Sequence, residues 1–170
     1  GAVGVEFASI YASFGSKVVL VEMLPRILPL EDEDSSAAVA RSFQARGIRL
    51  LTGARLTEAR ADPGGSEAVA KVALPDGKTE VLQAEWVLVA VGRRPYLDGL
   101  GLEVVGIVLE KGSIPVDGWM RTKVAGIYAI GDVVATPQLA HVASAEGILA
   151  VEKIAGRERQ PLNYARVPSC

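Results

Sequence analysis

Cysteine is almost absent from this chain: its single copy, Cys170, is the last of 170 residues. No disulfide can form within the chain, which is typical of a reducing compartment, so we expect a cytoplasmic location. Aromatic residues make up 5% of the sequence, which argues against a stacking surface for single-stranded nucleic acid. The chain has 18 basic and 20 acidic residues, which give a net charge of −2. It therefore lacks the excess of basic residues that binds nucleic acid or an anionic membrane.

Long apolar runs are also missing, so we expect no membrane-spanning segment. The first residues lack the basic stretch and apolar run of a signal peptide. There is no initiator methionine, and helix-type sequence begins at once without a preceding strand. We therefore expect these 170 residues to be part of a larger protein.

The first part of the chain alternates between helical and strand patterns. Apolar spacing predicts helices at 3–14 and 34–46, the second with an acidic start and a basic end. Short β-branched runs predict buried parallel strands at 17–22 and 48–51. One face of the first predicted helix carries its large apolar residues: Phe7, Ile10, Tyr11 and Phe14.

The pattern then changes to three strands, predicted at 55–61, 68–74 and 78–83. The turn signals between them are Pro63-Gly64-Gly65 and Pro75-Asp76-Gly77. Such short strands joined by turns indicate an antiparallel β-meander inserted into a parallel α/β pattern. The sequence as a whole therefore predicts an α/β fold with a Rossmann-like parallel sheet and a meander insertion.

The second part of the chain is less regular. We predict a fully buried strand at 86–91, a short strand at 127–130 closed by Gly131-Asp132, and a helix at 139–155. A soft boundary near 92–97 divides the chain into a nucleotide-binding domain at 1–95, whose first strand is missing, and a central segment at 96–170.

Two glycines open the first helix, and an acid closes the strand after it. Gly1, Gly4 and Glu22 stand in the order of the latter part of a G-x-G-x-x-G dinucleotide pattern, whose first strand and first glycine would precede Gly1. Gly1 would let the backbone approach a pyrophosphate, and Gly4 would let the helix pack closely on the strand. The helix N-terminus would offer free N–H groups to the phosphates, and Glu22 would bind the ribose hydroxyls.

These three residues also have a plain structural interpretation, in which the glycines serve tight packing and Glu22 is a solvated strand end. The order of glycines, helix, strand and acid favours the dinucleotide site. The Glu22 carboxylate would repel the 2′-phosphate of NADP, which favours NAD. Lys17 lies at the far end of the strand, but Arg26 lies within reach, so NADP stays open.

Four blocks of sequence carry a resemblance to a known family. They lie at residues 1–22 (GAVGVEFASIYASFGSKVVLVE), 87–96 (VLVAVGRRPY), 126–134 (GIYAIGDVV) and 139–156 (LAHVASAEGILAVEKIAG), and the closing YARVPSC agrees with them. Through these blocks the whole chain resembles the FAD-containing pyridine nucleotide–disulfide oxidoreductases. The last block favours the dihydrolipoamide dehydrogenase group over the glutathione or mercuric reductases.

The resemblance implies sites for two cofactors. The residues that would line NAD are Gly1, Gly4, Glu22, Leu56 and Gly92. The residues that would contact FAD are Asp132, at the ribityl chain, and the turn Gln138, Leu139, Ala140 and His141 under the flavin ring. The helix that starts there would stabilise negative charge on the reduced flavin. Glu6 would pair with a flavin-side lysine that is not in this sequence.

Simpler roles are open for several of these residues. Asp132 also suits a turn or a helix cap. His141 is the only histidine, so we expect no metal site at it, and its contribution would come mainly from backbone and packing. Glu6 also suits an exposed helix position, and Cys170 has no partner cysteine and would be structural.

The family's catalytic groups are absent from these 170 residues, so we predict no catalytic residue here. Its redox-active cysteine pair, His–Glu pair, FAD-pyrophosphate motif and dimer interface would all lie outside the sequence. By resemblance, the parent homodimer would oxidise dihydrolipoyl groups on lipoyl-bearing subunits of 2-oxo acid dehydrogenase complexes, through a disulfide and FAD to NAD. The alternatives are a related flavoprotein disulfide reductase or a non-catalytic nucleotide-binding module.

Overall fold

The computed structural model describes residues 1–62, 64–65 and 67–168. Pro63, which we predicted in a turn, and Cys170, which we predicted to be structural, lie outside the described residues. The chain divides into two compact units, Gly1–Gly92 (unit 1) and Arg93–Cys170 (unit 2), which are described separately. The assignment of cofactor roles to 1–95 and 96–170 stays a prediction.

Unit 1 begins with two helix–strand pairs. Helix α1 spans Ala2–Ser13, strand β1 Val19–Glu22, helix α2 Glu33–Ala45 and strand β2 Arg49–Thr52. Strands β1 and β2 pair in parallel, as a strand–helix–strand crossover requires. The four predicted elements are confirmed, with ends that differ by one or two residues.

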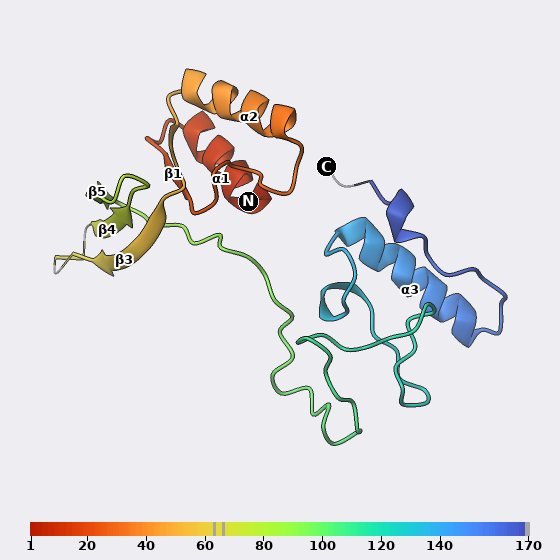
Figure 1. Ribbon diagram of the computed structural model, residues 1–170. Helices are drawn as coiled ribbons and strands as arrows, with labels where there is room; N and C mark the ends of the chain where they lie inside the picture. The colour runs from red at the N-terminus through yellow and green to blue at the C-terminus, as the bar shows by residue number, and fades with distance from the viewer. Residues whose placement is uncertain (63, 66, 169–170) are drawn as a thin grey trace. The chain divides into compact units, whose positions relative to one another are not determined.

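Both helices lie beside the parallel strands (Figure 1), and one apolar cluster joins the helices to the strands. Helix α1 turns its small residues to this cluster, so the large apolar face identified in the sequence is outward, and Phe14 is 83% exposed. The buried members are Ala8, Phe43 and Ile48, with Val5, Ala12, Val18, Leu20, Val39 and Leu50 packed around them.

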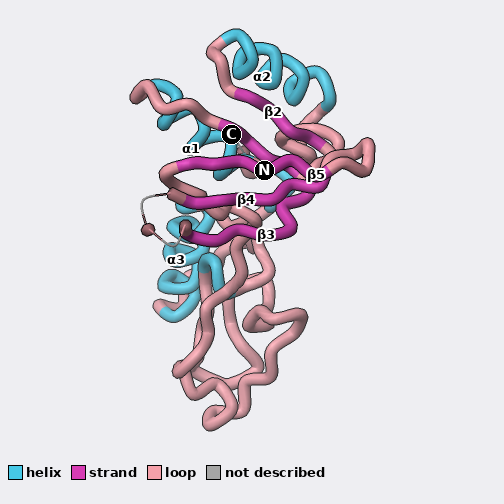
Figure 2. The backbone as a smooth tube through the Cα atoms, turned by 90° about the vertical axis from the view of Figure 1, so that its left-hand side faces the viewer, coloured by secondary structure: helices cyan, strands magenta, loops and turns pink. Residues whose placement is uncertain are grey.

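The three-stranded meander follows directly. Strands β3 (Arg55–Ala61), β4 (Ala68–Ala73) and β5 (Thr79–Ala84) lie side by side in this order and are antiparallel (Figure 2). At the second turn, the Asp76 carboxylate accepts a hydrogen bond from the Lys78 N–H, and Gly77 adopts φ +83°, as such a turn requires. The predicted meander and the mixed α/β fold class are confirmed.

The predicted strand at 86–91 is wrong. The described chain has no ladder there, and Trp86 and Val91 are 87% and 91% exposed. A β-branched run forms a strand only where a neighbouring strand offers hydrogen bonds, and within the described residues no strand pairs with this segment.

Unit 2 contains helix α3 (Ala140–Ile154) and the 3₁₀ turns η1 (Gly131–Val133) and η2 (Tyr164–Arg166). The predicted helix at 139–155 is confirmed. The predicted strand at 127–130 is wrong: its backbone bonds go to the neighbouring loop, with one isolated bridge between Arg121 and Tyr128.

The core of unit 2 is built from loops as well as from the helix. Residues Ile107, Ile114, Ala129 and Val134 form its buried cluster. Ile148, Val151 and Ile154 lie on one face of α3 and are exposed. The helix therefore buries a different face. The buried residues of α3 are Val142, Glu146, Leu149 and Ala150.

Candidate functional site

Strand β1 ends at Glu22, whose side chain lies beside the start of α1. Glu22 Oε2 lies 2.8 Å from the Gly1 nitrogen, and Oε1 accepts a hydrogen bond from the Leu24 N–H at 3.0 Å. Partial burial raises the pKa of Glu22, but the Leu24 N–H and the Gly1 amino group outweigh burial, so its pKa lies below the usual value. An ionised carboxylate therefore stands beside the start of α1, and its contact with a ribose stays a prediction.

The two glycines of the pattern occupy different surroundings. A Cβ atom at Gly4 would lie 3.7 Å from Leu20 Cδ1 and 3.8 Å from the Ala90 Cβ, so α1 approaches β1 and the 86–91 segment within contact distance. A Cβ at Gly1 would meet nothing within 4 Å, and no side chain caps α1. The first N–H groups of α1 thus lack a side-chain acceptor and suit an anionic ligand.

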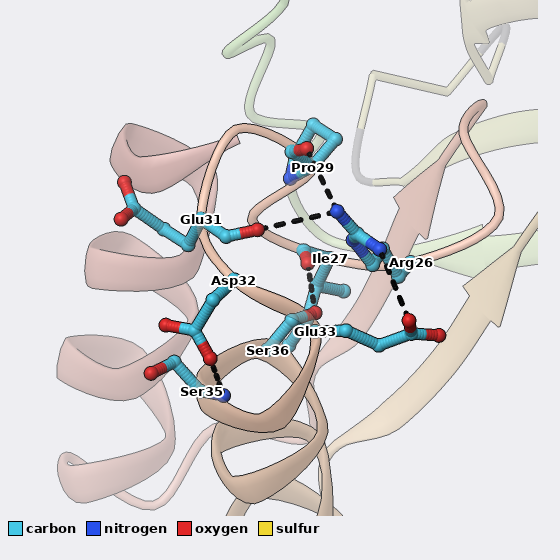
Figure 3. A network of polar contacts seen from close by, with 8 residues as sticks. All are labelled: Arg26, Ile27, Pro29, Glu31, Asp32, Glu33, Ser35 and Ser36. Atoms are coloured by element: carbon cyan, nitrogen blue, oxygen red, sulfur yellow. Dashed lines mark hydrogen bonds and ion pairs between the residues drawn. The ribbon is translucent and has the colours of Figure 1, made fainter.

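Arg26 contacts the loop that follows β1 and the start of α2 (Figure 3). Its Nη2 atom donates to the carbonyls of Glu31 at 3.2 Å and Pro29 at 3.4 Å, and its Nη1 lies 4.0 Å from Glu33 Oε2. The guanidinium is therefore engaged by the loop between β1 and α2. Its role as a partner for a 2′-phosphate, which the sequence left open, stays a prediction.

The start of α2 keeps that loop in shape. Asp32 accepts a hydrogen bond from the Ser35 N–H at 2.8 Å as the N-cap, and buried Ser36 donates its hydroxyl to the Ile27 carbonyl (Figure 3). These bonds anchor both ends of the loop whose Pro29 and Glu31 carbonyls accept from Arg26.

Leu56 and Gly92 lie elsewhere in unit 1. Leu56 is in β3 and is 39% exposed. Gly92 adopts φ +129°, which side chains rarely allow, and a Cβ there would meet nothing within 4 Å. The structure joins Gly1 and Glu22 directly, and the contacts of Leu56 and Gly92 with a nucleotide stay predictions.

In unit 2, the predicted flavin residues lie around η1 and the start of α3. Asp132 is half-exposed in η1, where Oδ2 lies 3.1 Å from Arg93 Nη1. Gln138 Nε2 donates to the Asp132 carbonyl at 3.4 Å. Arg93 was missed by the sequence interpretation, although it directly follows Gly92 in the VGRRP block.

Helix α3 begins with the predicted turn. Leu139 is its N-cap, without a side-chain cap, and Ala140 is its first residue. His141 Nε2 lies 3.1 Å from the Pro168 carbonyl, which ties the helix start to the end of the described chain. Glu6 lies on the exposed side of α1, and its role beside a flavin-side lysine stays a prediction.

Glu146 was also missed by the sequence interpretation. It is fully buried in α3, accepts a hydrogen bond from the Gly131 N–H at 2.7 Å, and accepts another from the Tyr164 hydroxyl at 2.9 Å. Burial, together with the bond to Glu146, raises the pKa of Tyr164 to about 12. Glu146 stands four residues after Val142 and four before Ala150, on the buried face of α3. An acid at such a position in an apolar helix indicates a buried carboxylate with hydrogen-bond partners.

Two further features concern the described ranges only. Within them, no three His, Cys, Asp or Glu side chains gather as metal ligands would. None of the helices there is both long and apolar enough to cross a membrane.

Comparisons with known proteins agree with this geometry. The family model described as pyridine nucleotide-disulphide oxidoreductase matches residues 1–147. The dihydrolipoyl dehydrogenases of Zymomonas mobilis and Rhizobium etli are 45% and 41% identical to the chain, over all of its length and 36% and 35% of theirs. The chain thus spans about a third of the length of these curated relatives.

Solved structures show the same fold. The crystal structure of LpdA from Mycobacterium tuberculosis matches with a TM-score of 0.83 and 34% identity, covering 95% of this chain and 34% of that one. The HOCl-induced flavoprotein disulfide reductase RclA from Escherichia coli matches with a TM-score of 0.83 and 26% identity, over 95% of this chain and 36% of that one. The chain belongs to the pyridine nucleotide-disulphide oxidoreductase family.

Proposed function

We propose that the chain forms the NAD-binding part and a portion of the FAD site of a dihydrolipoyl dehydrogenase. The observation that carries this proposal is the position of Glu22 at the end of β1, where Oε1 accepts a hydrogen bond from the Leu24 N–H at 3.0 Å and Oε2 faces the start of α1. It sets an ionised acid beside an uncapped helix N-terminus, the two groups that a ribose and a pyrophosphate need. The names of relatives at 41–45% identity supply the substrate class.

NAD is the preferred nucleotide in this proposal. Glu22 would accept hydrogen bonds from the adenosine ribose, while Gly1, Gly4, Leu56 and Gly92 would line the rest of the path. A 2′-phosphate would meet the Glu22 carboxylate, and like charges at contact repel. Arg26, the nearest candidate for neutralising that phosphate, is held by Glu31 and Pro29.

The flavin side rests on two elements of unit 2. Asp132 would accept a hydrogen bond from the ribityl chain, and Gln138, Leu139, Ala140 and His141 would lie under the flavin ring. The start of α3 has no side-chain cap, so its N–H groups suit the negative charge of a reduced flavin. When bound, FAD would supply the two-electron transfer between a dithiol and NAD.

The remaining parts of the proposal concern the full-length protein that contains this chain. Its electron donors would be dihydrolipoyl groups on lipoyl-bearing subunits of 2-oxo acid dehydrogenase complexes. It would act as a homodimer in the cytoplasm, with the nucleotide domain at 1–95 and the flavin-contacting segment at 96–170.

Dihydrolipoamide oxidation by the purified full-length protein tests the proposal. We expect bound FAD, and reduction of NAD at least tenfold faster than that of NADP at equal concentration. A flavoprotein that ignores dihydrolipoamide but reduces another disulfide would instead be a related reductase. A protein that binds NAD but no flavin would be a non-catalytic nucleotide-binding module.

A further inference from the structure

Glu146 is a carboxylate that the described fold has fully buried in the middle of α3. Burying a carboxylate is costly unless both of its oxygens are hydrogen-bonded. Both are: Oε2 accepts from the Gly131 N–H at 2.7 Å, and Oε1 accepts from the Tyr164 hydroxyl at 2.9 Å. The carboxylate therefore ties α3 to two segments that are distant in sequence.

The Gly131 segment is also pressed closely onto α3. Gly131 adopts φ +72°, and a Cβ there would come within 3.3 Å of the Ala143 Cβ. On the helix side, a Cβ at Gly147 would come within 3.3 Å of Ile130 Cδ1. Two glycines thus allow the close approach, and the bond from Gly131 to Glu146 fixes its register.

Asp132 follows Gly131 directly, and α3 begins eight residues later. A rotation of the Gly131 peptide would move the Asp132 carboxylate relative to the uncapped helix start. The bond from the Gly131 N–H to Glu146 opposes that rotation. Tyr164 holds the second oxygen of Glu146, so the acid cannot turn away without losing a partner.

We infer that Glu146 and Tyr164 are positioning residues for the flavin site, which hold the Gly131–Asp132 turn against α3. The inference rests on the proposed function, since it concerns the orientation of Asp132 toward FAD. A purely structural role would affect the stability of unit 2 and leave the flavin's affinity and spectrum unchanged. The two roles are therefore separable by experiment.

The test uses the full-length protein with three variants: Glu146→Ala, Glu146→Gln and Tyr164→Phe. The matched control is Glu152→Gln, the same change on the same helix, at a residue whose partners are Arg157 and Arg159. For each protein, we would measure the FAD Kd by reconstitution of the apoprotein, the visible circular dichroism of the bound flavin, and the unfolding midpoint of the apoprotein.

We expect Glu146→Ala to weaken FAD binding by about ten- to thirtyfold, because the bond that holds the Gly131–Asp132 turn is lost and the turn is released. Glu146→Gln should restore most of the affinity, since its amide oxygen can still accept from Gly131 and its NH₂ can donate to the Tyr164 oxygen. Tyr164→Phe should weaken binding by roughly three- to tenfold. The flavin dichroism should change in the Ala and Phe variants and match wild type in the control.

Wild-type FAD affinity and dichroism in both Glu146→Ala and Tyr164→Phe would overturn the positioning role, whatever their unfolding midpoints. If the Ala variant does not fold, the Phe variant decides alone, by the same criterion. A wild-type protein that contains no FAD would overturn the proposed function and, with it, this inference. Bound FAD with unchanged variants would overturn only the inference.

Discussion

Unit 1 pairs much of its backbone in helices and in two sheets, whereas much of unit 2 between Arg93 and Leu139 has neither helix nor strand. The apolar cluster around Phe43 fills the space between helices and strands in unit 1. In unit 2, a fully buried acid, Glu146, joins the helix to two loops. Stability in unit 1 therefore depends mainly on apolar packing, while in unit 2 it also depends on a few specific buried polar bonds.

The largest effect should come from the core of unit 1. Phe43→Ala should lower the free energy of unfolding by about 3–5 kcal/mol, because Phe43 is 4% exposed and its removal leaves a cavity. Urea unfolding of the full-length protein would measure this loss. The matched control is Phe14→Ala, whose exposed ring should matter by less than about 0.5 kcal/mol. Equal losses in the two variants would contradict this description of the core.

The second largest effect should come from Glu22, at the proposed nucleotide site of unit 1. Glu22→Ala should weaken NAD binding by about 1.5–3 kcal/mol, because hydrogen bonds to a charged acceptor are lost, and should leave FAD content unchanged. Titration of the full-length protein with NAD and NADP would measure both affinities. Equal affinities in wild type, or tighter binding of NADP, would contradict the role of Glu22.

The flavin turn of unit 2 should show a smaller loss. Asp132→Ala should weaken FAD by about 1–2 kcal/mol, since Asp132 is half-exposed and its bonds are screened by water. His141→Ala should change FAD affinity much less, because that contact is expected to come mainly from the backbone. Flavin content after gel filtration compares the two. Full flavin occupancy at low FAD concentration in Asp132→Ala would show that this turn is not a flavin contact.

The smallest effect concerns pH. The pKa of Tyr164 is raised from 10.0 to about 12 in the folded chain, so its stabilising bond is fully present below pH 10 and is lost as pH rises toward 12. Tyr164→Phe should remove this part of the alkaline loss of stability. Unfolding midpoints of wild type and variant between pH 9 and 12 would test it, and parallel curves would contradict the raised pKa.

Periodicity predicted most of unit 1 and little of unit 2. The helices and strands from Ala2 to Thr52 and the meander follow from local apolar spacing and turn residues. The strand predicted at 86–91 failed because a β-branched run forms a strand only beside a hydrogen-bonding neighbour. At 127–130, bonds to a nearby loop replaced the expected ladder.

The candidate site was predicted in the same uneven way. Gly1 directly precedes α1 and Glu22 ends β1, so their positions were accessible from the local pattern, whereas Asp132 was identified through the GIYAIGDVV block. The roles of Arg93, Glu146 and Tyr164 depend on partners 15 to 39 residues away, and no local pattern encodes such pairs.

The sequence by itself determined the α/β class, the order of the elements and the placement of an acid after β1, because these depend on local spacing and on residue type. Only the tertiary structure decided that Arg26 is engaged by its own loop and that α1 turns its small face to the core. It also decided that a buried carboxylate joins η1, α3 and η2. Each of these outcomes depends on which distant groups come within hydrogen-bonding or packing distance, and that is a property of the folded chain.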